Sequence, residues 1–449
     1  MACGLASAAF CDTFDAPSAN KGRAGELDAT RWSASRAAPQ LPSGGGVATA
    51  IGPATIGSCR SGLPAQVYPS QDALVCSANA SIASPHLLVA VAAQNYGQNS
   101  YRIRQPFDFS GRTGKIVFDA DASVLNSLIG WISVEVVEDP TNAPSFIAGI
   151  YDNDEDGSIP RNGFELQLQN RCDGYVTTPH VGLRMLMLYK NYKATTLEAP
   201  APPVCVDTKP GHLNHVEVEV SQQSISIWAT PYSVDGKSFG SAVLLHSAAV
   251  NLPFSRGYVS ITTHNHASEK YSFDTMDAWV ARWDNVGFDG PVVNKWREYE
   301  VADSLTPGVA GIQATSFPAR PVVSIGYRVA DAVDGPAQTL RLRNVSLDNA
   351  VSARLSLSAW YLTSAAFGAD PTKFVLRYRF NGKAWHDRKL TADELAVLTS
   401  LSRGQLSQML DVPLSDLVTG DNTLEFVTVN VPQSYPPLIA NIDLVLETK

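Results

Sequence analysis

The chain has 449 residues, of which 45% are hydrophobic and 17% charged, so it is long enough for two or three globular domains and too apolar for a disordered chain. Its 34 basic and 43 acidic residues give a net charge of −9, which disfavours a nucleic-acid partner because phosphates bind basic surfaces. No apolar run reaches the ~18 residues of a membrane span, so we expect none.

The N-terminal sequence, MACGLASAAFCDTF, lacks the charged region and long apolar core of a signal peptide. All six cysteines lie in the first half of the chain, and their even number favours disulfides formed in an oxidising compartment. The simplest pairing joins neighbours along the chain: Cys3 with Cys11, Cys59 with Cys76, and Cys172 with Cys205. We therefore expect a secreted protein whose export signal has been removed before Met1. A cytosolic protein that begins at Met1 is the alternative.

Short runs of alternating apolar and polar residues begin near residue 87 and are separated by turn residues, a pattern typical of an antiparallel sandwich or barrel. Val216, Val218 and Val220 alternate with glutamates, and the run after them completes a predicted hairpin. The predicted strands are 100–103, 114–119, 130–137, 163–169, 183–189, 215–220, 224–229 and 257–263.

The run 283–291 closes this pattern, so we place a first domain over 1–292 and a connector over 293–318. Residues 319–449 repeat the strand pattern and predict a second sandwich. Its strands are expected at 322–329, 339–345, 353–362, 373–380, 422–429 and 439–446. Thr391 and Glu394 have the spacing of a capping box, which predicts one short helix. The predicted fold is all-β, with two β-sandwich (jelly-roll) domains.

The hairpin that joins GHLNHVEV (211–218) to ISIW (225–228), together with the closing WDNV (283–286), resembles the concanavalin A-like, laminin-G-like jelly-roll superfamily over roughly residues 12–291. The resemblance implies glycan binding or glycoside hydrolysis. The best-known glucanases of that superfamily carry a Glu-x-Asp-x-x-Glu strand, whereas the nearest segment here, SVEVVED at 133–139, lacks the middle Asp. The second domain is similar to accessory sandwich modules of extracellular polysaccharide-acting proteins.

Glycoside hydrolysis needs two carboxyl groups on one surface. Glu135 shares a strand face with Trp131, and Glu165 shares one with Gln167. If these two strands are neighbours, Glu135 and Glu165 form an acid/base or acid/nucleophile pair, with Trp131 stacking on sugar. The alternative is two exposed glutamates on sheet surfaces.

Tyr258, His264 and His266 share one face of the strand that begins near 257, with the two imidazoles about 7 Å apart. We expect these side chains to contact sugar hydroxyls, and Arg104, with Arg102, to recognise an acidic substrate. With a third ligand the histidines could instead hold a transition metal. Two surface or half-buried histidines at a strand end are the plain alternative.

Asp152, Asp154 and Asp156 supply oxygen ligands at positions 1, 3 and 5 of a loop with Gly157 at position 6, which resembles the start of a calcium loop. The twelfth position is Gly163, so the usual bidentate Glu is missing. We expect a structural Ca²⁺ and no organic cofactor. An acidic, solvated turn is the alternative.

The leading hypothesis is an extracellular carbohydrate-active protein that hydrolyses a polysaccharide in a groove of the first domain. A non-enzymatic glycan-binding (lectin or adhesion) protein is the main alternative, and a metal-dependent enzyme centred on His264 and His266 is the second. The sequence leaves the glycan, the role of the second domain and the oligomeric state open.

Overall fold

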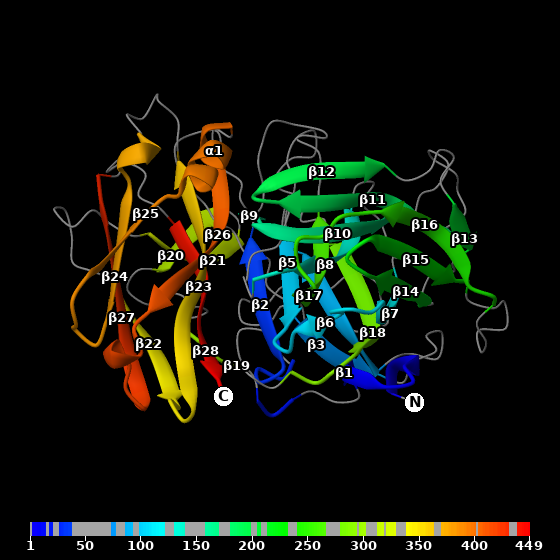
Figure 1. The fold of residues 1–449 in the computed structure, drawn as a ribbon, viewed down its shortest axis with the longest axis horizontal. Helices are drawn as coiled ribbons and strands as arrows, with labels where there is room; N and C mark the ends of the chain where they lie inside the picture. Colours follow the sequence, from blue (N-terminus) through cyan, green and yellow to red (C-terminus); the bar gives the residue numbers. More distant parts are fainter. Residues whose placement is uncertain are drawn as a thin grey trace.

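The structure, a computed structural model, describes residues 2–14, 18–20, 27–37, 73–77, 86–92, 98–121, 130–139, 158–169, 180–198, 204–207, 213–231, 240–265, 279–293, 296–301, 312–317, 320–328, 338–362, 370–400, 403–430 and 438–449 (Figure 1). Its strands form four sheets, here named I to IV, and the predicted all-β fold is confirmed. No helix in these ranges is long and apolar enough to cross a membrane.

Sheets I and II make the first sandwich. Sheet I has the order β16 (Val243–Ala249), β15 (Ser224–Thr230), β14 (Asn214–Val220), β7 (Gly114–Asp121), β18 (Trp279–Asp289), β4 (His86–Ala92) and β3 (Ala73–Ser77), and β1 (Ala8–Asp12) pairs with β18. Sheet II has the order β12 (Lys193–Glu198), β11 (His180–Lys190), β10 (Asn162–Gln169), β8 (Gly130–Val137), β17 (Arg256–Asn265), β5 (Gln98–Ile103) and β2 (Trp32–Ala37), with β13 (Cys205–Asp207) on β11 and β6 (Phe107–Asp108) on β17.

Sheets III and IV make the second sandwich. Sheet III has the order β20 (Ile312–Phe317), β21 (Arg320–Arg328), β28 (Leu438–Thr448), β23 (Ala350–Leu362), β26 (Arg403–Val412) and β9 (Ser158–Ile159), with β19 (Trp296–Glu300) on β28. Sheet IV has the order β22 (Gln338–Val345), β27 (Gly420–Val429), β24 (Val375–Phe380) and β25 (His386–Lys389). The 3₁₀ turns are Ala2–Gly4, Pro371–Lys373 and Leu414–Asp416.

One apolar core fills each sandwich. Alternate residues of neighbouring strands point inward, as Val134 and Val136 of β8 and Phe164 and Leu166 of β10 do in the first. Leu355 and Leu357 of β23 are among those in the second. The predicted period-two pattern is thereby confirmed for these strands.

The predicted capping box is also confirmed. The Thr391 hydroxyl accepts a hydrogen bond from the Glu394 amide at 3.2 Å, and the Glu394 carboxylate accepts one from the Thr391 amide at 2.7 Å. The predicted short helix is α1 (Ala392–Ser400), and β26 begins shortly after it, at Arg403.

The junction between the sandwiches is polar. The two sandwiches lie side by side (Figure 1), and β9, which comes from the first half of the chain, pairs in parallel with β26 of sheet III. The Ser33 hydroxyl of β2 donates to Asp443 of β28 at 2.9 Å, and Arg102 of β5 forms an ion pair with Glu298 of β19. The side chains of Arg102 and Glu298 are 2% and 4% exposed. Buried charge therefore joins the outer face of sheet II to sheet III.

The segment 293–318, predicted as a connector, contains β19 and β20 of sheet III. β19 has the polar sequence WREYE and forms a strand because it pairs with β28 and supplies Glu298 and Glu300 to the junction.

The first disulfide is as predicted: Cys3 and Cys11 are bonded, with their Cα atoms 5.8 Å apart. Cys205 is also disulfide-bonded. Cys59 and Cys172 lie outside the described residues, so the other two pairings stay predictions.

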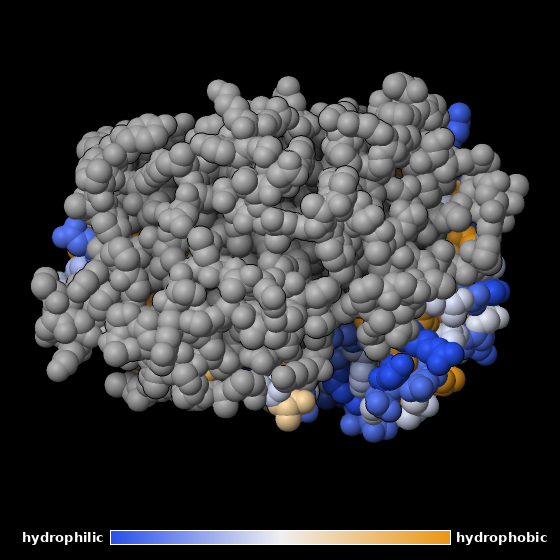
Figure 2. Space-filling view, turned by 180° about the vertical axis from the view of Figure 1, so that it is seen from behind, coloured by the Kyte–Doolittle hydropathy of each residue, from blue (hydrophilic) through white to orange (hydrophobic). Residues whose placement is uncertain are grey.

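The outward face of sheet IV carries ion pairs, such as Arg379 with Glu425 at 2.7 Å and Arg377 with Asp387 at 2.8 Å. Seen from behind, the described part of the surface at the lower right is mainly hydrophilic, with smaller hydrophobic areas (Figure 2).

Candidate functional site

Glu135 and Glu165 are direct cross-strand partners on β8 and β10, so the structure brings the two predicted carboxyl groups together. They lie on the outer face of sheet II, opposite the apolar core. Both are fully buried, with exposed fractions of 1% and 0%.

Hydrogen bonds fix the Glu165 carboxyl group. Its Oε1 accepts from the Ser133 hydroxyl at 2.7 Å and from the Gln167 amide at 3.0 Å, and its Oε2 accepts from the Tyr189 hydroxyl at 2.8 Å. Burial raises the pKa of Glu165, and these three hydrogen bonds oppose the rise. The group can therefore carry a proton, which general acid catalysis requires, but no part of it faces solvent.

Glu135 accepts a hydrogen bond from the Thr262 hydroxyl of β17 at 3.0 Å, and Thr262 in turn contacts the Ser100 hydroxyl of β5 at 2.9 Å. The polar face of sheet II thus extends across β5, β17, β8 and β10. It is a hydrogen-bonded layer rather than an open groove.

Other predicted site residues lie along this sheet. Tyr258 is buried, with the Arg102 guanidinium 5.3 Å from its ring centroid. Arg104 donates to the Trp32 carbonyl at 3.0 Å and to Glu300 at 2.9 Å, so its charge is used at the domain junction.

The backbone of His264 pairs with Trp131 of β8 and with Gln98 of β5. The side chains of Trp131 and His264, and all of His266, Asp152, Asp154 and Asp156, lie outside what the structure describes. Within the described ranges no three His, Cys, Asp or Glu side chains gather as a metal would need. The sugar, metal and calcium roles of these residues stay predictions.

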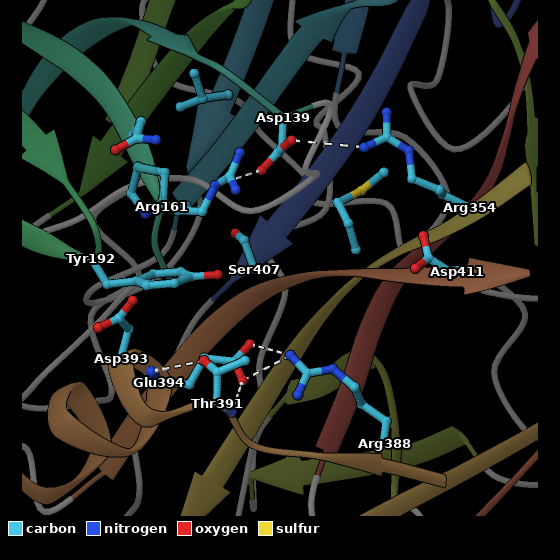
Figure 3. Close-up of a pocket in the computed structure, with 14 residues that line it drawn as sticks. Asp139, Arg161, Tyr192, Arg354, Arg388, Thr391, Asp393, Glu394, Ser407 and Asp411 are labelled. Atoms are coloured by element: carbon cyan, nitrogen blue, oxygen red, sulfur yellow. Dashed lines mark hydrogen bonds and ion pairs between the residues drawn. The ribbon is translucent and has the colours of Figure 1, made fainter. Parts of the chain in front are cut away.

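A pocket of about 380 Å³ opens at the junction between the two sandwiches (Figure 3). Six lining residues come from the ends of β8 to β12, and eight come from β23, β25, α1 and β26. They are Val137, Asp139, Pro160, Arg161, Asn162, Tyr192, Arg354, Arg388, Thr391, Asp393, Glu394, Ser407, Met409 and Asp411.

Some charged groups of the pocket are held by other protein groups. Glu394 accepts two hydrogen bonds from Arg388 at 2.6 and 2.7 Å and a third from Gln408 at 3.2 Å. Arg161 donates to Glu138 at 2.8 Å. Glu394 and Arg161 therefore form fixed walls of the pocket.

Other groups of the pocket are less constrained. Asp393 and Asp411 are exposed, and no hydrogen bond or ion pair of their carboxylates occurs within the described chain. Arg354 is the cross-strand partner of Asp411 and approaches Asp139 at 3.9 Å. Asp393 and Asp411 are therefore available to a ligand, and Arg354, whose guanidinium also lies 5.6 Å from the Trp296 ring centroid, borders the pocket beside them.

Burial raises the pKa of Asp139, and the adjacent Arg161 opposes the rise. Burial and the nearby Glu394 and Asp139 raise the pKa of Tyr192 to about 12, so its hydroxyl keeps its proton at neutral pH. A protonated phenol is a hydrogen-bond donor as well as an acceptor.

The pocket and the carboxyl pair lie on the same sheet face. Val137, which lines the pocket, follows Glu135 by two residues, so their side chains are about 7 Å apart along β8. Its cross-strand partner is Gly163, where a Cβ atom would lie 2.8 Å from the Val136 carbonyl oxygen. A glycine is therefore needed for this close approach of the two strands.

Sequence reasoning missed the pocket. Its charged residues come from five segments between 139 and 411, and no spacing in the sequence indicates that they meet. The one available signal was the capping box at Thr391 and Glu394, which predicted the helix but not its role as a pocket wall.

No protein-family profile matches this sequence, and no curated protein sequence matches it either. Solved structures that this chain matches include the exoplasmic/lumenal domain of VIP36 bound to Ca²⁺ and Man3GlcNAc, with 11% identity, 54% of this chain and 91% of that chain covered, and a TM-score of 0.29. The carbohydrate recognition domain of Emp47p has 13% identity, with 49% of this chain and 90% of that chain covered, and a TM-score of 0.27. Peanut lectin has 10% identity, coverage of 49% and 91%, and a TM-score of 0.29.

These identities and TM-scores are low, and the fold of the first domain follows from its own sheets. It has two opposed antiparallel sheets, of eight and nine strands, around one apolar core. This arrangement is the β-sandwich predicted from the sequence for the first domain.

Proposed function

We propose that this chain is a glycan-binding protein and that a neutral sugar binds in the pocket between its two sandwiches. The observation that carries the proposal is the balance of charge in the pocket, where three guanidinium groups face four carboxyl groups. An anion or a cation would meet like charge on every side there. A neutral, hydroxyl-rich ligand can donate to the carboxylates and accept from the guanidinium groups.

Size and access also favour the junction pocket. Its volume of about 380 Å³ lies at the lower end of the range for small-ligand sites, about 300–1,000 Å³. Arg354, Asp393 and Asp411 are the groups we assign to sugar hydroxyls. Glu135 and Glu165, in contrast, have no exposed surface with which to contact a polysaccharide. Binding without hydrolysis is therefore the favoured function.

We also propose that the protein is secreted. The Cys3–Cys11 disulfide supports this location, because structural disulfides form in oxidising compartments. Calcium binding at Asp152, Asp154 and Asp156 is kept as a prediction. Calorimetric titration of Ca²⁺ into wild type and into the variant in which these three aspartates are replaced by Asn tests it.

Hydrolysis by Glu135 and Glu165 is a second candidate function, favoured by their direct cross-strand pairing. It requires the junction to open, because both carboxyl groups are buried. A metal-dependent enzyme at His264 and His266 is a third, tested by metal analysis of the untreated and chelator-treated protein.

The deciding experiment is a glycan array combined with a reducing-sugar assay on the same glycans. We expect binding to neutral glycans with no release of reducing ends. Release of reducing ends that is lost in both Glu135→Gln and Glu165→Gln would establish hydrolysis instead. No binding to any glycan would overturn the proposed function.

A further inference from the structure

We propose that Tyr192 is the aromatic platform on which a pyranose ring of the ligand stacks, and that it selects sugars with an apolar ring face. This inference rests on the proposed function. It assigns to one side chain a role that the charged residues of the pocket cannot fill.

The backbone at Tyr192 is unusual. Asn191 and Tyr192 form the two-residue turn between β11 and β12, where Lys190 pairs with Lys193. Their φ angles are +50° and +60°, the left-handed values of a type I′ turn. Such turns favour Asn followed by Gly, because a side chain at the second position crowds the backbone. Here a large aromatic side chain occupies the glycine position.

Neighbouring groups hold this turn in place. The Tyr192 amide donates to the Arg161 carbonyl at 3.0 Å, and the Asn191 amide donates to the Asn162 side chain at 3.0 Å. Unfavourable backbone conformations that are held by surrounding structure occur often at ligand sites. The observed outlier at a pocket wall therefore points to a function for the side chain.

The side chain of Tyr192 extends across the pocket. In Figure 3 its ring lies between Asp139 and Arg161 on one side and Asp393 and Glu394 on the other, with its hydroxyl toward Ser407. It is the only aromatic residue among the described lining residues. A flat apolar surface surrounded by charged groups matches a pyranose, which has an apolar C–H face and a rim of hydroxyls.

Tyr192 also packs against the apolar core of the second sandwich. A role limited to holding the domains together would need an apolar side chain but no aromatic ring. Leucine and phenylalanine variants separate the two roles, because both keep apolar packing and only phenylalanine keeps the ring.

The experiment compares wild type, Tyr192→Phe and Tyr192→Leu by NMR and calorimetry. The probes are the methyl α- and β-glycosides of glucose, galactose and mannose, together with the neutral oligosaccharide that binds most strongly on the array. We expect ring protons of the bound sugar to shift upfield with wild type and Tyr192→Phe, because they lie over an aromatic face. We expect Tyr192→Leu to lose this shift and to bind about tenfold more weakly than Tyr192→Phe. The melting temperature of each variant reports the packing contribution of Tyr192 separately.

The outcomes separate the two proposals. Equal affinity in Tyr192→Phe and Tyr192→Leu, or no upfield shift with wild type, would overturn the stacking role while glycan binding stands. A lower melting temperature for Tyr192→Leu, with affinity equal to that of Tyr192→Phe, would assign Tyr192 to domain packing alone. No binding of any probe by wild type would overturn both proposals.

Discussion

Glu135 and Glu165 face each other across β8 and β10 on the outer face of sheet II, with no solvent access to either carboxyl group. Burial penalises the charged form of a carboxyl group, and it raises the pKa of Glu165 above its ordinary value. This relationship makes the stability of the first sandwich depend on pH.

Replacing Glu165 by Gln tests that dependence. Because the folded-state pKa of Glu165 is raised above the ordinary 4.5, its contribution to stability is complete below that value and is lost as the pH rises through the folded-state pKa. We expect the free energy of unfolding of the wild type to fall over this interval, and Glu165→Gln to fall less. Urea denaturation from pH 4 to pH 8 measures the difference. Glu219→Gln, at a half-exposed position beside Lys115, is the control. Identical slopes for Glu165→Gln and wild type would contradict the account.

The capping box of α1 predicts a graded loss of stability. Thr391→Ala removes one capping hydrogen bond and should lower the free energy of unfolding by about 1 kcal/mol. Glu394→Ala also removes the buried carboxylate to which Arg388 and Gln408 donate, and it should cost about 3 kcal/mol. Chemical denaturation measures both. Asp393→Asn, at the exposed neighbouring position, is the control and should change the free energy of unfolding little. A loss of stability in Glu394→Ala no greater than that in Thr391→Ala would argue against a structural role for the buried carboxylate.

The junction should weaken when Arg102 is replaced by Met. This change removes the closest cation of the buried Glu298 and leaves Arg104, at 3.3 Å, as its remaining ion-pair partner, so the poorly compensated charge favours separation of the two sandwiches. Small-angle scattering should show a larger radius of gyration, and limited proteolysis should become faster. Arg377→Met removes a partner of the exposed Asp387, so it serves as the matched control. An unchanged radius and proteolysis rate for Arg102→Met would refute the role of this ion pair.

Local patterns in the sequence predicted much of the fold. Alternating residues such as Val134, Glu135 and Val136 identify strands because each faces either the core or the polar layer. The strands β25 and β26 were missed, since β25 is short and polar and β26 follows directly after the helix. The pairing of β9 with β26 was also missed, because two residues carry no periodic signal.

The candidate site was less predictable. The pairing of Glu135 with Glu165 was foreseen only on the condition that their strands are neighbours. Their burial was not foreseen, because sequence does not reveal that polar faces such as those of Ser33 and Asp443 meet at a domain junction. The pocket depends on the same long-range docking, so no local pattern could predict it.

The most direct test of the central claim is calorimetric titration of the strongest neutral oligosaccharide from the array into wild type, Arg354→Ala and Arg379→Ala. Arg354 lines the pocket, whereas Arg379 is paired with Glu425 on the outward face of sheet IV. We expect Arg354→Ala to raise the Kd about tenfold or more, because a hydrogen bond from a charged donor contributes about 1.5–3 kcal/mol, and Arg379→Ala to leave it unchanged. Equal affinity in all three proteins would contradict binding at the junction pocket.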